Sequence, residues 1–137
     1  MHIPRPTFVF ILLAATGCGP SQFPVTGKVT FPDGSPLEEG IVICETTDGE
    51  KPVMARGTLK KDGTFRLGTT EPGNGAPVGK YRVLVVPRAL NEYERNVRLP
   101  FIDSKYERFE SSGLTLEVVN GPRELLITVT KPQDKAR

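Results

Sequence analysis

Few side chains in this 137-residue chain could act as a nucleophile, a general base or a soft metal ligand. The histidine and cysteine residues are His2, Cys18 and Cys44. A Ser-His-Asp or Cys-His arrangement needs a histidine beside the nucleophile, and zinc needs several cysteine or histidine ligands. The one histidine lies at the extreme N-terminus, so we expect no such site. Carboxylate-only chemistry stays open, but no acidic pair is singled out. We therefore expect no enzymatic activity, no metal and no cofactor.

Cys18 is marked by the residues that precede it. A short positive start is followed by an almost unbroken apolar run over residues 7–15, and residues 15–17 are all small. This layout describes a secretory signal, and the run is shorter than the roughly 20 residues of a membrane-spanning helix. A cysteine directly after the small residues resembles a bacterial lipoprotein signal, in which the thiol is acylated. We therefore expect a signal peptide over residues 1–17 and a covalent acyl or diacylglycerol lipid on Cys18.

Simple secretion is the alternative. A signal cut near Ala15 or Gly17 would leave Cys18 free to pair with Cys44, and Ala15 stands where the lipoprotein pattern prefers Leu. The sequence after Cys18 favours the lipid, because Gly-Pro-Ser-Gln is typical of a flexible tether, here residues 18–24. We expect an exported protein that is lipid-anchored to a bacterial membrane and faces the periplasm or the cell exterior.

The charge balance argues against nucleic acid as a partner. Removing residues 1–17 takes away Arg5 alone, so 18 basic residues become 17 against 16 acidic ones, a net charge of +1. Nucleic-acid binding calls for a clearly basic face. Lys60-Lys61 is the only adjacent basic pair and is expected in a solvated turn. Cys44 ends the apolar run 41–44 and is expected to be a buried, inert thiol.

From Val25 onward the pattern is β throughout, so the fold class we expect is all-β, a seven-stranded sandwich over residues 25–131 with a tail at 132–137. Strand-like runs alternate with Gly, Pro, Asn and Asp clusters. Asp62-Gly63 is the strongest hairpin signal. The predicted strands are Val25–Phe31, Gly40–Thr46, Val53–Leu59, Thr64–Thr69, Tyr81–Val86, Leu114–Val119 and Glu124–Thr130.

Residues 87–113 form the long connection between the fifth and sixth predicted strands. A connection of this length is usually functional or mobile. One interpretation is an interaction loop with a charged rim; its aromatic anchors would be Tyr93, Phe101, Tyr106 and Phe109. The other is that Tyr106 and Ile102 plug one open end of the sandwich while the charged residues lie in water.

Several motifs follow one another in a specific order and spacing over residues 18–130. They are Val25-Thr26-Gly27-Lys28-Val29-Thr30-Phe31, Asp33-Gly34, Asp62-Gly63-Thr64-Phe65, residues 73–81, and Lys105-Tyr106 before Ser112-Gly113-Leu114-Thr115. Together they resemble small bacterial lipoproteins with a carboxypeptidase regulatory-like, transthyretin-like domain. The resemblance implies a prealbumin-like, Ig-like Greek-key sandwich on a lipid tether and transfers no activity. Asn74 stands where that family favours Asp, which argues against a metal in the turn.

These observations predict a non-enzymatic cell-envelope module for protein–protein interaction or structural support. Its expected partners are the membrane surface, reached through the lipid, and an unidentified envelope protein or glycan. The alternative is a carbohydrate- or small-ligand-binding module that stacks rings on the aromatic residues of the 87–113 loop. The absence of tryptophan from the chain weighs against that alternative.

Overall fold

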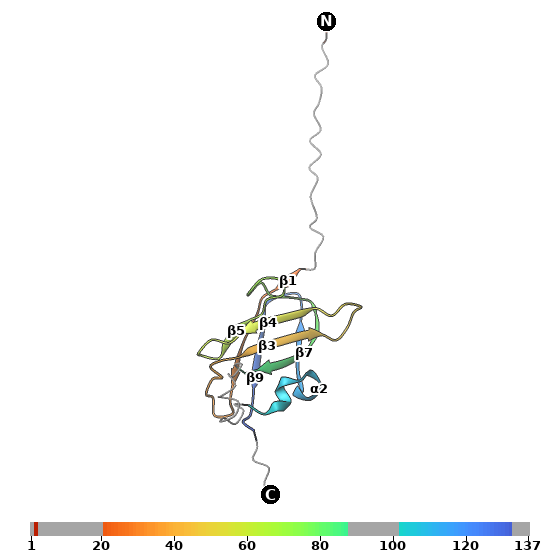
Figure 1. The fold of residues 1–137 in the computed structure, drawn as a ribbon. Coiled ribbons are helices and arrows are strands. Elements are labelled where there is room, and N and C mark those ends of the chain that lie inside the picture. The colour runs from red at the N-terminus through yellow and green to blue at the C-terminus, as the bar shows by residue number, and fades with distance from the viewer. Residues whose placement is uncertain (1, 3–20, 88–101, 133–137) are drawn as a thin grey trace.

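The described part of the protein is mostly β-sheet. The structure is a computed structural model that describes residues 2, 21–87 and 102–132 (Figure 1). These residues form nine strands, a 3-10 helix η1 (Ser104–Glu107) and a short α-helix α2 (Phe109–Ser112). The strands are β1 Gln22–Phe23, β2 Val25–Thr30, β3 Ile41–Thr46, β4 Met54–Thr58, β5 Thr64–Arg66, β6 Ala76–Pro77, β7 Gly79–Val86, β8 Leu114–Val118 and β9 Arg123–Thr128.

The strands are arranged in three sheets. Two larger sheets, with strand orders β5-β2-β9 and β4-β3-β7-β8, form a sandwich-like pair, and β1 with β6 makes a third. β2 and β9 run parallel in register from Val25↔Arg123 to Thr30↔Thr128, and the other pairings are antiparallel. The parallel pair brings the first and last strands of the larger sheets side by side.

Seven of the observed strands overlap the seven predicted ranges, and β1 and β6 are additional. These two strands are two residues long, too short for period-two alternation to be visible. The predicted loop 87–113 also differs from expectation. Its final part contains η1 and α2 where the sequence showed no regular element, and residues 88–101 lie outside the described part.

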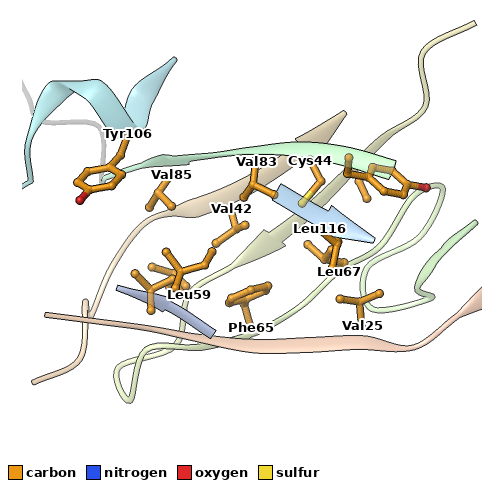
Figure 2. Close-up of a cluster of buried hydrophobic side chains, with 14 of the residues drawn as sticks. Val25, Val42, Cys44, Leu59, Phe65, Leu67, Val83, Val85, Tyr106 and Leu116 are labelled. Atoms are coloured by element: carbon orange, nitrogen blue, oxygen red, sulfur yellow. The ribbon is translucent and has the colours of Figure 1, made fainter. Parts of the chain in front are cut away.

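The core lies between the two larger sheets and follows from alternation along each strand. In β2 the inward positions are Val25, Gly27 and Val29, and their neighbours are exposed or half-buried. Figure 2 shows Val25 and Phe65 on one side of this core, with side chains of the β4-β3-β7-β8 sheet opposite. The buried hydrophobic residues come from every strand of both larger sheets.

Phe65 on β5 lies against glycines of both larger sheets. A Cβ on Gly27 would lie 2.3 Å from the Phe65 Cζ atom, and a Cβ on Gly57 would lie 3.0 Å from its Cδ2 atom. The Phe65 ring therefore occupies the space that two glycines leave, one on β2 and one on β4. Any side chain at Gly27 would also meet the Leu125 carbonyl oxygen at 2.3 Å.

Cys44 is part of the same core and confirms the expected buried thiol. Its side chain is fully buried and unpaired in the described structure. Burial raises the pKa of the Cys44 thiol to about 12, because a thiolate would lose its hydration. At neutral pH the group is a protonated, small hydrophobic side chain without nucleophilic character.

Two turns share an Asp-Gly sequence and the same hydrogen bonding. The Asp33 carboxylate accepts from the Ser35 amide and hydroxyl, and the Asp62 carboxylate accepts from the Thr64 amide and hydroxyl. These bonds favour the charged form and lower the pKa of both carboxyls. The following Gly34 and Gly63 have φ angles of 89° and 80°, which L side chains rarely adopt.

Gly27→Ala is expected to destabilise the fold by about 1–3 kcal/mol, the usual cost of overpacking a core. The added methyl group must displace the Phe65 ring and push β2 away from β9. Thermal unfolding should show a melting temperature lower by several degrees. Lys28→Ala, at the exposed neighbouring position, is the control and should stay within about 0.5 kcal/mol of the parent. An unchanged Gly27→Ala melting temperature would contradict this packing.

The Cys44 thiol is expected to resist modification while the protein is folded. In a Cys18→Ser chain, where Cys44 is the only thiol, a disulfide reagent should react roughly 100-fold or more slowly with folded protein than with protein unfolded in guanidinium. The unfolded sample controls for reagent quality. Equal rates in both states would show that Cys44 is accessible and the core assignment wrong.

Candidate functional site

The lipid-acceptor residue predicted from the sequence, Cys18, lies outside the described residues, and so do Tyr93 and Phe101. The described chain shows where the predicted tether joins the domain. β1 pairs with β6 through Gln22↔Pro77 and Phe23↔Ala76. Phe23 packs against the core, and Figure 1 shows β1 at one end of the domain. The predicted tether of residues 18–24 is therefore too long at its C-terminal side, because residues 22–23 form β1 and are fixed at that end of the domain.

Tyr106 and Ile102 are core side chains. Ile102 is fully buried and Tyr106 is 6 % exposed. The Tyr106 hydroxyl lies 3.3 Å from the Thr130 hydroxyl oxygen, and Asp103 caps η1 by accepting from the Lys105 amide at 3.0 Å. This burial confirms the plug interpretation for these two residues, and it leaves the Tyr106 ring unavailable as a stacking platform.

Phe109 is half-buried against β7. The Arg82 guanidinium carbon lies 4.7 Å from the centre of the Phe109 ring, a cation–π geometry. Arg82 also forms salt bridges to Glu45 at 3.1 Å and to Glu110 at 4.0 Å. The Ser112 hydroxyl donates to the Val83 carbonyl oxygen and ties the end of α2 to the same strand. One predicted anchor, Phe109, thus contributes to a described surface.

Beside Arg82 lies an apolar strip on the outer face of the β4-β3-β7-β8 sheet. Ile41 stands opposite Val86 and Ile43 stands opposite Leu84, so the four side chains share a face. Ile41 is 40 % exposed, Ile43 and Val86 are half-buried, and Leu84 is 8 % exposed. We call these four residues the apolar strip.

A groove between β4 and β5 is the second surface feature, with a volume of about 530 Å³. Three of its side chains are basic, namely Arg56, Lys60 and Arg66. Its lining comprises Arg56, Gly57, Thr58, Lys60, Arg66, Gly68, Thr69, Thr70, Glu71, Pro72 and Gly73. Sequence analysis missed this site, although the alternation of Arg56, Thr58 and Lys60 was a visible signal.

The described residues contain neither a cluster suited to a metal ion nor a helix that could span a membrane. Over residues 2, 21–87 and 102–132, no three His, Cys, Asp or Glu side chains are grouped so as to hold a metal ion. None of the helices found there is long and apolar enough to cross a bilayer.

Asn74, between two glycines, bonds to its own loop: its side-chain oxygen accepts from the Thr69 amide at 2.8 Å.

Comparison with known proteins yields a fold and no family. No protein-family model matches the chain, and no curated protein matches it, so the resemblance to carboxypeptidase regulatory-like domains stays a prediction. The crystal structure of a DUF3823 family protein from Parabacteroides merdae matches with a TM-score of 0.50 and 20% identity, covering 82% of this chain and 48% of that one. The chain thus spans about half the length of that protein, and the likeness extends to the fold alone.

A second solved structure, a 9R-lipoxygenase from Cyanothece, matches more weakly. Its TM-score is 0.42 at 18% identity, with 82% of this chain and 17% of that chain covered. A similarity at this level says nothing about the chemistry of this chain.

Proposed function

We propose that this protein is a lipid-anchored, non-enzymatic cell-envelope module that binds another envelope protein through the outer face of its β4-β3-β7-β8 sheet. The observation that carries the proposal is the apolar strip with Arg82 and Phe109 at its border. Protein interfaces typically combine an apolar centre with a polar rim and are enriched in aromatic residues, Met and Arg.

The composition of this face fits such an interface. On β4, Thr58 and Arg56 stand opposite Ile41 and Ile43 and give the apolar strip a polar border, and Met54, 41 % exposed, stands opposite Glu45. Arg82, held by Glu45 and stacked on Phe109, is already ordered in the free protein. A pre-ordered Arg loses less rotamer entropy when a partner binds.

The lipid on Cys18 would hold this face close to a membrane. Four peptide steps separate Cys18 from Gln22, the first residue of β1, and a fully extended chain spans at most about 3.5 Å per residue. The tether would therefore reach about 14 Å. A partner in the same membrane surface would then meet the domain at a high effective concentration.

The finer fold assignment is also an inference. Leaving out β1 and β6, the chain passes from one larger sheet to the other after β2, β4, β5 and β8. Such repeated crossing is typical of Greek-key sandwiches, and we infer a seven-stranded, prealbumin-like sandwich with two small accessory strands.

Cys18→Ser is expected to release the protein from the membrane fraction of its native host, because the acyl chains supply the anchoring energy. Cys44→Ala is the matched control and should leave the protein in the membrane, since that thiol is buried. Fractionation followed by immunoblotting measures the partition. If the Cys18→Ser protein stays in the membrane fraction, the lipid anchor is refuted.

A photo-crosslinking residue at Ile41 is expected to capture one reproducible envelope protein in intact cells. The control is the same residue at Leu126 on β9, which is 70 % exposed and lies on the other sheet. Capture at Ile41 should be lost when Val86→Glu is added, because a charge in the strip would be buried in the interface. Equal capture at both positions, or none at Ile41, would contradict an interface on the apolar strip.

A further inference from the structure

The β4–β5 groove concentrates positive charge that the net charge of the chain conceals. Arg56, Lys60 and Arg66 line it together with a single carboxylate, Glu71. Among the described residues, the salt bridges belong to Arg82, and none joins these three cations to a carboxylate. All three side chains are exposed.

Arg56 and Arg66 are placed by strands β4 and β5, and Lys60 follows β4 at the start of the turn between them. Arg56, Thr58 and Lys60 alternate along one extended segment, so they project to one side, and Arg56 and Lys60 stand about 13 Å apart at 3.3 Å per residue. Arg66 joins them from the neighbouring segment. Paired backbone hydrogen bonds of 2.9 and 2.8 Å between Arg56 and Gly68 hold the two segments together.

The loop that closes one end of the groove is internally braced. The Asn74 side chain accepts from the Thr69 amide and donates to the Thr70 hydroxyl at 2.7 Å, and the Thr69 hydroxyl donates to the Gly75 carbonyl at 2.8 Å. Gly68 admits no side chain, since a Cβ there would lie 2.1 Å from the Glu71 carbonyl oxygen. The walls are therefore ordered before any ligand arrives.

We infer that this groove binds an extended acidic polysaccharide, with its carboxylate groups on Arg56, Lys60 and Arg66. A row of cations about 13 Å long matches a chain with repeated charges better than a single small anion. Arg forks suit carboxylates, and the hydroxyls of Thr58 and Thr70 face the groove beside them, where sugar hydroxyl groups can bond.

Two other polyanionic partners fit less well. Single-stranded nucleic acid is usually held by aromatic side chains on which the bases stack, and the groove lining contains no aromatic residue. A flat bilayer surface contacts protruding residues, whereas these cations line a recess between two strands. The apolar strip shares no residue with the groove but adjoins it, because Arg56 and Thr58 stand opposite Ile43 and Ile41 across β4 and β3.

The test is binding of polygalacturonate oligomers to the full chain purified in detergent, measured by titration calorimetry at physiological salt. The parent protein should bind, and an Arg56→Gln/Arg66→Gln variant should bind at least about tenfold more weakly. The reason is that losing one charge-assisted hydrogen bond lowers the affinity by roughly a factor of ten. The control is Lys80→Gln/Arg123→Gln, which removes two exposed charges outside the groove and should bind as the parent does.

Thermal unfolding of both variants confirms folding, since all four side chains are exposed. Absence of binding by the parent, or equal loss in both variants, would overturn the groove assignment. Tighter binding of oligothymidylate or of anionic lipid vesicles than of polygalacturonate would overturn the polysaccharide assignment. A neutral glucan of equal length should not bind, and its binding would show that the cations are not the determinant.

Discussion

The contact of the Phe65 ring with two glycines is the constraint on which the rest of the molecule depends. The ring fills the space above Gly27 of β2 and Gly57 of β4, so the shortest strand of the larger sheets, β5, sets how closely the two sheets meet at that edge. Because side chains alternate along a strand, burying Phe65 turns the next residue, Arg66, outward. Arg66 therefore lies beside the outward-facing residues of β4, such as Arg56 and Thr58, in the lining of the groove. The groove is thus a consequence of core packing.

The end of the domain that carries the predicted tether is built by the same loop that closes the groove. Gly75 has a φ of 91°, and a Cβ there would lie 2.2 Å from the Phe23 carbonyl oxygen, so β1 passes directly over this glycine. Asn74, one residue earlier, braces the loop with its amide group. A carboxylate here could accept from the Thr69 amide but could not donate to the Thr70 hydroxyl. The Asn74 amide group thus bonds to two polar groups of its own loop.

The strands of the larger sheets were predictable because they show alternating apolar residues or, in β3 and β7, a continuous apolar run, and Gly, Pro, Asn or Asp turns separate them. Which strands pair with one another could not be predicted. The parallel pairing of β2 with β9, for example, joins residues almost 100 positions apart and leaves no local pattern in the sequence. β1, β6, η1 and α2 are too short to show a period. Burial of Cys44 was predictable from its apolar neighbours, whereas Tyr106 stands among polar and charged residues, so its sequence left two interpretations open. The groove required knowing that Arg66 lies beside β4.

Net charge was the sequence property least able to reveal the groove, because it averages over residues with different roles. Asp33 and Asp62 are engaged by their own turns, and Glu45 is paired with Arg82. Asp62 lies only two residues from Lys60, yet its carboxylate accepts from Thr64. These hydrogen bonds leave the carboxylates of Asp33 and Asp62 charged, so the positive character of the groove rests on position: three cations and one carboxylate line it. A near-neutral chain can therefore present a locally basic recess where the fold gathers cations and leaves most of its carboxylates outside the lining.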